Sequence, residues 1–179
     1  MDRKSDKYER KVPKPLTSAS LDWFALRYVE RFATTRAKLR RYLQGKVRER
    51  GWASDGVAPI DAVVERLAGL GYVDDRAFGE AKARGLERRG FGVRRVAQAL
   101  TVAGLEPDLR TEISETVDGE AAAIAYARRK KLGPFAVSEA TPELQRKQFA
   151  AMVRAGHPFD VVKRVMNARS EADLGESED

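Results

Sequence analysis

Residues 93–104 read VRRVAQALTVAG, and this stretch decides the class of fold. Its apolar side chains recur at steps of three and four, which places them on one side of an α-helix. They are Val93, Val96, Ala97, Leu100 and Ala103. Gly104 follows directly, and glycine is the residue that most often ends a helix. The same spacing recurs along the chain without the sustained alternation of a half-buried strand, so we predict an all-α protein.

Proline and glycine divide the predicted helices into three groups. Pro59, Pro107 and Pro158 each begin a helix, lie 48 and 51 residues apart, and are followed within two residues by an aspartate. Gly104 and Gly156 each close a helix and lie 52 residues apart. A period near 50 residues at several landmarks indicates a repeat array. We predict three tandem three-helix repeats in an elongated, curved array whose hand the sequence leaves open.

Charge runs at both ends set the outer boundaries of this array. The predicted segments are a flexible basic arm at 1–19, repeats at 20–73, 74–117 and 118–167, and a flexible acidic tail at 168–179. The predicted N-caps are Ser20, Asp74 or Asp75, and Thr141. The predicted apolar faces include Leu21, Phe24, Ala25, Tyr28 and Phe32; Ile60, Val63, Val64, Leu67 and Leu70; Phe78 and Ala81; Ala121, Ile124, Ala125 and Leu132; and Phe149, Met152 and Val153.

The charge balance favours a polyanionic partner. The chain has 179 residues, 42% of them hydrophobic, and a net charge of +7. The arm carries +3 and the tail −4, which leaves +8 on residues 20–167. Nucleic acid is the obvious polyanion, although a well-solvated basic surface explains the charge equally well. Because the sequence holds no cysteine, signal peptide or membrane span, we expect a cytoplasmic protein without disulfides, thiolate metal sites or membrane contact.

The residues that catalysis needs are scarce. The single histidine, His157, lies in a turn between glycine and proline, where a packing role is expected. Asp74 and Asp75 are read as helix caps and not as an acid/base pair. Residues 90–92 begin like a nucleotide-binding loop, but Arg95 occupies the place of its third glycine. We therefore predict no enzyme activity, no catalytic residue, no metal and no cofactor.

Arginine is the chemistry that the chain does supply. Many basic residues lie opposite the apolar faces or at helix ends, where guanidinium groups can pair with phosphates or with protein carboxylates. Some of them only solvate the surface or complement a helix dipole. The predicted binding surface consists of Arg36, Lys38, Arg41, Arg48, Arg88, Arg89, Arg94, Arg95, Arg128, Arg129, Lys130 and Arg154.

One run of residues resembles a known family. The run at 71–78, GYVDDRAF, is followed by Arg88-Arg89-Gly90 and then by Val96, Leu100, Gly104 and Leu105. This pattern is similar to the central motif of RecX regulatory proteins. In the first repeat, Tyr28, Arg31, Phe32, Thr35, Arg36, Leu39 and Leu43 also resemble the family pattern. The sequence departs from that pattern at residues 154–157, 45–58 and 133–141, which leaves the helix lengths there open.

The resemblance implies a function without catalysis. RecX proteins are bacterial modulators of the RecA recombinase, built from tandem three-helix repeats. The resemblance implies a negative regulator that lies in the groove of a RecA filament on single-stranded DNA. There it restrains ATP hydrolysis and strand exchange, favours disassembly, and so modulates recombinational DNA repair and the SOS response. The expected partners are the RecA filament and, weakly and without sequence preference, single-stranded DNA, with duplex DNA as a further candidate; the expected state is a monomer.

Two other hypotheses stay open on the residues alone. Three short helices joined by tight turns also describe a stand-alone helix-turn-helix-like DNA-binding protein. An enzyme with an unfamiliar site is the third hypothesis, and a deep pocket lined by converging carboxylates would favour it.

Overall fold

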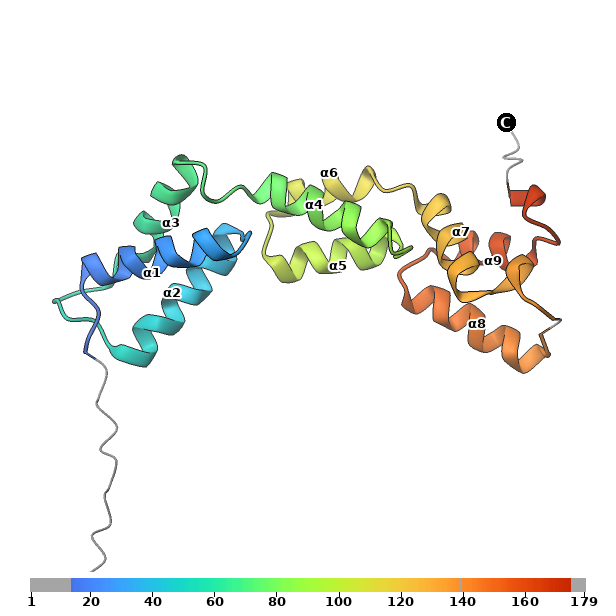
Figure 1. Cartoon of the computed structure of the whole chain (residues 1–179), viewed down its shortest axis with the longest axis horizontal. Helices are drawn as coiled ribbons and strands as arrows, with labels where there is room; N and C mark the ends of the chain where they lie inside the picture. Colours follow the sequence, from blue (N-terminus) through green and yellow to red (C-terminus); the bar gives the residue numbers. More distant parts are fainter. Residues whose placement is uncertain (1–13, 139, 175–179) are drawn as a thin grey trace, which may run out of the picture. The chain divides into compact units, whose positions relative to one another are not determined.

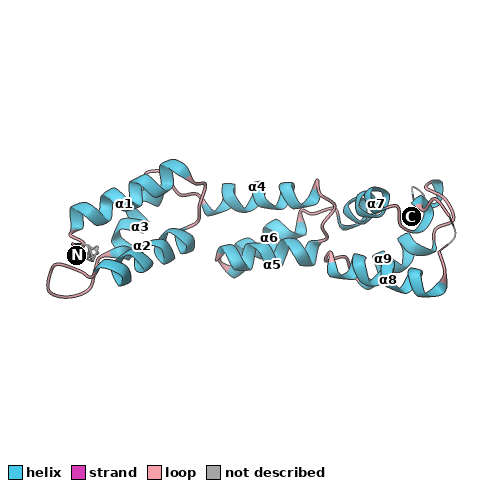
Figure 2. Ribbon diagram, turned by 60° about the horizontal axis from the view of Figure 1, so that its bottom comes forward, coloured by secondary structure: helices cyan, strands magenta, loops and turns pink. Residues whose placement is uncertain are grey.

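The structure is a computed structural model that describes residues 14–138 and 140–174. Its elements are nine α-helices and two short 3-10 helices, and the described residues contain no β-strand beyond one isolated bridge between Leu16 and Trp52 (Figures 1 and 2). The prediction of an all-α fold is confirmed. The chain divides into two compact units, Met1–Val73 and Asp74–Asp179.

The first unit contains three helices around one core. They are α1 (Ser18–Arg31), α2 (Arg36–Arg50) and α3 (Ile60–Gly69). Leucine and valine side chains spaced by three and four residues meet in its centre, because each helix turns one apolar face inward. The core residues are Leu16, Leu21, Ala25, Leu39, Leu43, Val63, Val64, Leu67 and Val73.

The first helix begins earlier than predicted. Thr17, not Ser20, is the N-cap, and its hydroxyl accepts a hydrogen bond from the Ser20 amide at 3.3 Å. Ser20 returns a bond, since its Oγ accepts from the Thr17 amide at 2.8 Å. This reciprocal pair is a capping box, in which the second residue lies three positions after the cap. Leu16 is buried in the core, so residues 16–19 belong to the folded unit and not to a flexible arm. The part of the predicted arm at 1–13 lies outside the described residues.

The second unit contains six α-helices. They are α4 (Asp75–Glu87), α5 (Val93–Ala103), α6 (Pro107–Glu115), α7 (Gly119–Lys130), α8 (Pro142–Arg154) and α9 (Phe159–Asn167). The 3-10 helices are η1 (Gly133–Phe135) and η2 (Ala172–Leu174). Asp74 and Thr141 cap α4 and α8 as predicted. Each of the three predicted prolines lies at a helix start, before α3 and α9 and as the first residue of α6.

Two separate cores lie within the second unit. Helices α4–α6 enclose Ala83, Leu86, Val96, Leu100, Ala103, Leu105 and Ile113. Helices α7–α9 and the following turn enclose Ala123, Ala127, Leu132, Met152, Val162, Val165 and Leu174. With the core of the first unit, these give three cores in the order of the three predicted repeats. By its contacts, however, the chain forms two units, so the division into three repeats stays a prediction.

Several residues predicted to be apolar core lie at the surface. Phe32 and Leu70 follow the last turn of α1 and α3 and are 51% and 65% exposed. In α7 the buried positions are Ala122, Ala123 and Ala127, and the predicted Ala121 and Ala125 are exposed. Because alanines occupy most sides of this helix, the spacing of its apolar residues does not single out one face. The predicted Ala81 and Val153 are exposed as well.

The predicted acidic tail is packed over its first seven residues. Leu174 is buried in the third core, and Glu171 forms an ion pair with Arg128 of α7. The Asp173 carboxylate accepts hydrogen bonds from the Ser170 hydroxyl and from the amides of Ser170 and Arg169. The hydroxyl bond above all lowers the pKa of Asp173. The prediction of a flexible tail therefore does not hold for 168–174, and 175–179 lie outside the described residues.

None of the helices in the described ranges combines the length and the apolar character that crossing a membrane requires.

Candidate functional site

The two halves of the second unit meet through two turns. The turn between α4 and α5 pairs with the turn between α8 and α9. The Gly92 amide donates to the Ala155 carbonyl at 3.0 Å, and the Arg94 amide donates to the Gly156 carbonyl at 3.1 Å. This contact, called the turn junction below, brings the start of α5 against the end of α8.

Glycine allows the backbones to approach this closely. A Cβ on Gly92 would lie 2.4 Å from the Gly156 carbonyl oxygen. A Cβ on Gly156 would lie 2.4 Å from the Arg95 amide nitrogen, and Gly156 also has a φ of +96°, which disfavours any side chain. The motif that resembled a nucleotide-binding loop therefore serves as a close-packing turn.

His157 is buried at the centre of the turn junction. Its Nε2 lies 3.1 Å from the Gly90 carbonyl, so in the neutral ring Nε2–H donates and Nδ1 is the acceptor. Nδ1 is covered and has no partner among the described residues. Burial lowers the pKa of His157, against the opposing effect of the Gly90 carbonyl. The neutral, enclosed ring has a packing role, as the sequence predicts.

Six of the predicted basic residues gather around the turn junction. They come from the end of α4, the start of α5, the last turn of α7 and the last residue of α8, and all are exposed. We call them the junction cluster: Arg88, Arg89, Arg94, Arg95, Arg129 and Arg154.

Two members of the junction cluster lie over aromatic rings. The Arg89 guanidinium lies 5.1 Å from the centre of the Phe91 ring, and that of Arg129 lies 5.6 Å from the centre of the Tyr126 ring. The Tyr126 backbone in turn packs on Gly90, where a Cβ would be 2.8 Å from the Tyr126 amide nitrogen. Aromatic faces attract cations, so these contacts hold the guanidinium groups near the turn without neutralising them.

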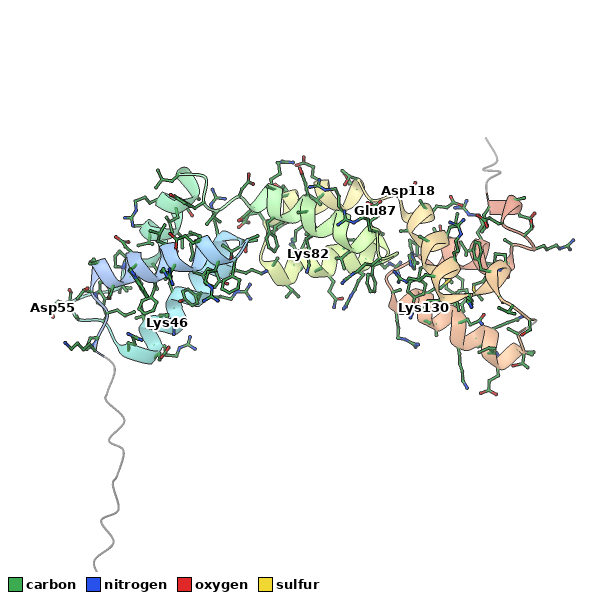
Figure 3. The ribbon with its side chains drawn as sticks, in the orientation of Figure 1. Lys46, Asp55, Lys82, Glu87, Asp118 and Lys130 are labelled. Atoms are coloured by element: carbon green, nitrogen blue, oxygen red, sulfur yellow. The ribbon has the colours of Figure 1, made fainter. Side chains whose placement is uncertain are left out.

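No member of the junction cluster forms an ion pair with the residues that the structure describes. Arg95 donates to the side-chain oxygen of Gln98 at 2.7 Å, which leaves its charge uncompensated. The neighbouring Glu87 accepts a hydrogen bond from the Asp118 amide at 3.1 Å, and Figure 3 shows these two residues side by side. Asp118 in turn caps α7. The nearby carboxylates thus bind backbone amides, and the guanidinium groups remain open to an external anion.

The remaining predicted residues of the second unit have other surroundings. Arg128 pairs with Glu171 and lies 5.3 Å from the centre of the Phe135 ring, so the C-terminal segment holds it. Lys130 is exposed at the end of α7. Arg128 is therefore not part of the junction cluster, although Arg129, the next residue, is.

The four predicted residues of the first unit all lie on α2. Arg36 forms an ion pair with Glu65 of α3 at 3.3 Å, and the Arg41 Nε donates to the Ala37 carbonyl at 3.3 Å. Lys38 is half-buried and Arg48 is exposed. An α3 carboxylate thus partly neutralises this set, in contrast to the junction cluster.

The sequence prediction missed a second basic surface on α1 and α2. There aromatic side chains alternate with arginine and lysine. Phe24, Tyr28 and Tyr42 pack against the first core, as their spacing predicts, but Phe32 has the same spacing and is exposed. The basic residues three or four positions after Trp23, Tyr28 and Tyr42 are the sequence signal for this surface, and they are Arg27, Arg31 and Lys46.

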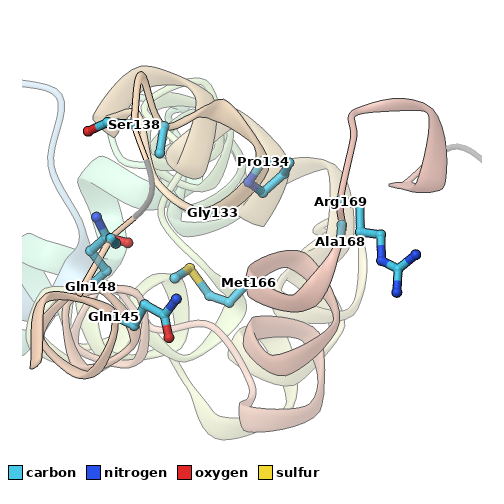
Figure 4. A pocket seen from close by; sticks show the side chains of 10 residues that line it. Gly133, Pro134, Ser138, Gln145, Gln148, Met166, Ala168 and Arg169 are labelled. Carbon is cyan, nitrogen blue, oxygen red and sulfur yellow. The ribbon is translucent and has the colours of Figure 1, made fainter. Parts of the chain in front are cut away.

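The structure also contains hollows large enough for a small ligand. A pocket of about 650 Å³ lies beside η1, α8 and α9, and Figure 4 shows Ser138, Gln145, Gln148 and Met166 around it. The described lining residues of this pocket include no carboxylate. Among residues 14–138 and 140–174, no group of three or more His, Cys, Asp or Glu side chains is placed to hold a metal.

A smaller hollow between α4 and α6 does hold carboxylates. Its volume is about 320 Å³, and Glu80, Glu87 and Glu112 line it. Glu112 accepts two bonds from Arg76, at 2.5 and 2.7 Å, and the side-chain bond above all lowers the pKa of Glu112. Glu80 lies 3.5 Å from Arg84. The Glu112 carboxylate, which Arg76 holds ionised, is unsuited to donate a proton, so this hollow gives the enzyme hypothesis no support.

Comparisons with known proteins find regulatory proteins called RecX among the relatives. No family model matches the chain. The regulatory protein RecX of Myxococcus xanthus is 32% identical over 168 residues, which cover 88% of this chain and 90% of that protein. The regulatory protein RecX of Agrobacterium fabrum is 29% identical over 162 residues, covering 87% and 88%.

Solved structures agree on the fold. The crystal structure of RecX from Lactobacillus salivarius matches with a TM-score of 0.67 at 14% identity, over 85% of this chain and 96% of that one. A second crystal structure of a regulatory protein RecX matches with a TM-score of 0.66 at 14% identity, over 84% of this chain and 72% of that one. At this identity the match concerns the fold alone.

Proposed function

The chain belongs to the RecX family of regulatory proteins, and from that premise we propose that it is a negative regulator of the RecA recombinase. In this proposal it binds in the groove of the RecA filament on single-stranded DNA and restrains ATP hydrolysis and strand exchange. Binding favours filament disassembly and thereby modulates recombinational DNA repair and the SOS response.

The junction cluster is the observation that carries this proposal. Its six exposed guanidinium groups come from four helices of one unit and lack ion-pair partners among the described residues. Guanidinium groups pair with phosphates and with carboxylates in the same bidentate geometry. A filament groove offers both, as DNA phosphates and as acidic protein side chains. We assign the junction cluster to that contact.

The other predicted residues contribute less in this proposal. Lys38, Arg41 and Arg48 extend the basic surface onto α2, and Lys130 extends it beyond α7. Arg36 and Arg128 already pair with Glu65 and Glu171, so contact with the filament exchanges one carboxylate for another anion. Exposed pairs of this kind contribute little to stability, and the exchange costs little.

The proposal specifies a protein that works by binding alone. It acts as a monomer in the cytoplasm and needs no cofactor. Many modest charge contacts supply the binding energy, so affinity for the filament decreases as salt increases.

Measuring DNA-dependent ATP hydrolysis by RecA tests the proposal. The protein should lower hydrolysis at substoichiometric ratios. The triple variant Arg94→Gln/Arg95→Gln/Arg154→Gln should inhibit much less, because it removes three charges of the junction cluster. The matched control Lys82→Gln/Lys147→Gln/Lys163→Gln removes three exposed charges elsewhere in the same unit and should inhibit like the wild type. Unchanged hydrolysis at every ratio of the wild type contradicts the proposal.

Binding to oligonucleotides alone separates this function from a stand-alone DNA-binding protein. The proposal expects weak, salt-sensitive binding without sequence preference. A sequence-specific duplex complex with nanomolar affinity in the absence of RecA favours the helix-turn-helix-like alternative.

A further inference from the structure

The α1–α2 hairpin of the first unit carries aromatic side chains interleaved with cations on one surface. Its aromatic members are Trp23, Phe24, Tyr28 and Phe32 of α1 with the following residue, and Tyr42 of α2. Its basic members are Arg27, Arg31, Lys46 and Arg50. These nine residues are called the aromatic-basic face.

The aromatic rings form two groups that Lys46 bridges, because its Nζ lies 5.7 Å from the centre of the Phe24 ring and 6.0 Å from that of the Tyr42 ring. The Trp23 and Phe24 rings meet edge to face with centres 5.0 Å apart. The Tyr28 ring lies 5.4 Å from that of Phe32 and stacks on that of Tyr42 at 4.2 Å. The second group therefore crosses from α1 to α2.

Each cation of the face lies against a ring. Arg27 lies 5.7 Å from the centre of the Trp23 ring, and Arg50 lies 4.9 Å from that of Phe24. Lys46 lies 5.7 Å from the centre of the Phe24 ring. Arg31 likewise lies 5.7 Å from the Phe32 ring. Cations and rings thus occupy one continuous surface.

Burial in the core accounts for only part of this face, because Phe24, Tyr28 and Tyr42 pack against the first core, but Trp23 and Phe32 remain exposed. Trp23 is 57% exposed and Phe32 is 51% exposed, although large aromatic side chains usually bury most of their surface. Exposed apolar groups that cluster in this way mark interaction sites more often than isolated ones do.

The charges of the face are only partly compensated. Arg27 lies 4.0 Å from Glu30, and Lys46 lies 2.7 Å from Glu49. Arg31 and Arg50 form no ion pair with the described residues. The Nε of Arg50 is in addition covered and without an acceptor within the described part of the chain. The face therefore has a positive balance, and two of its arginines form no ion pair with the described residues.

We propose that the aromatic-basic face binds single-stranded nucleic acid, with bases stacked on Trp23 and Phe32 and phosphates paired with Arg31 and Arg50. Aromatic side chains stack on any base, and neighbouring cations follow the backbone. A duplex hides the faces of its bases inside the helix, so a stacking surface selects single strands. The inference rests on the proposed function for its setting on a DNA filament, but its test requires no recombinase.

Tryptophan fluorescence reports on this face directly. The chain has two tryptophans, Trp23 and Trp52, so the Trp52→Phe variant leaves Trp23 as the sole reporter. Oligo(dT) should quench its fluorescence, whereas an abasic strand of equal length, which has phosphates but no bases, should quench far less. In the Trp23→Phe variant, which retains Trp52, the quenching should disappear. Equal quenching by the two strands, or none by oligo(dT), overturns the inference.

Affinity measurements with matched variants provide the second readout. Trp23→Ala should weaken oligo(dT) binding by about 5- to 150-fold, the range typical for loss of one stacked base. Tyr72 is 53% exposed in the same unit but outside the face, so Tyr72→Ala is the control and should bind normally. Arg31→Gln/Arg50→Gln should flatten the slope of log affinity against log salt by about 1.4, from roughly 0.7 for each lost phosphate contact on a single strand. Equal losses in Trp23→Ala and Tyr72→Ala overturn the inference.

The outcome is distinguishable from that of the proposed function. If the protein inhibits RecA but fails these binding tests, the proposed function stands and the aromatic-basic face is not a DNA site. If the protein passes the binding tests but does not affect RecA, this inference stands and the proposed function is contradicted.

Discussion

Replacing Gly92 with alanine tests the turn junction, because the conformation of this residue separates two opposing effects. Gly92 has φ −76° and ψ 169°, which any residue adopts without strain. In open space the substitution would therefore stabilise the fold by about 0.4–1 kcal/mol, because alanine lowers the conformational entropy of the unfolded chain. In this structure the new Cβ would lie 2.4 Å from the Gly156 carbonyl oxygen and 2.7 Å from the His157 amide nitrogen.

The magnitude follows from the contacts that must move. Both atoms belong to backbone, so relief of the overlap separates the two turns. That separation weakens the bond from the Gly92 amide to Ala155 and the bond from the Arg94 amide to Gly156, each worth about 0.5–1.5 kcal/mol. Overpacking adds about 1–3 kcal/mol. We expect a net destabilisation of roughly 2–4 kcal/mol.

Urea denaturation, monitored by circular dichroism, measures this loss of stability. Faster amide hydrogen exchange at Gly92 and Arg94 would show that the loss arises at the turn junction. Gly85→Ala is the matched control, because Gly85 lies inside α4 and its Cβ would meet only the tip of Arg88 at 4.0 Å. This control should stabilise the protein by about 0.5–1 kcal/mol. A Gly92→Ala variant that is as stable as the wild type, or more so, refutes the close contact between the turns.

Three further predictions concern stability. Burial lowers the pKa of His157 in the folded state, so the unfolded chain binds the proton more readily. The free energy of unfolding should therefore fall as pH drops from 7 to 5.5, and it should fall less in the His157→Gln variant. Asp74→Ala removes the side chain that accepts from the Ala77 amide at 2.9 Å and should cost about 1 kcal/mol in urea denaturation; no loss would mean that the cap is dispensable. Leu100→Ala opens a cavity in the second core and should lower the free energy of unfolding by about 2–5 kcal/mol, whereas a loss below 1 kcal/mol would contradict its full burial.

The helices themselves were predictable because local chemistry sets them. Apolar spacing, the Asp74 and Thr141 caps and the three prolines all act within a few residues. Prediction failed where two local signals competed. Thr17 and Ser20 are both good caps, and only the reciprocal bonds decide between them. In the alanine-rich α7, the apolar spacing left the buried face undecided.

The candidate site was predictable only in its residue types. The arginines of the junction cluster were identified individually, but their gathering depends on contact between glycines at 92 and 156, which lie far apart in the sequence. The aromatic-basic face was missed for the opposite reason. Phe24, Tyr28 and Phe32 have the spacing of a core face, and only tertiary packing reveals that Phe32 remains exposed.

A structure of this chain bound to a RecA filament on single-stranded DNA tests the central claim most directly. The account predicts that the junction cluster is covered by DNA phosphates or by acidic side chains of RecA within the filament groove. A bound chain whose junction cluster remains exposed to solvent, with another surface against the filament, would contradict it.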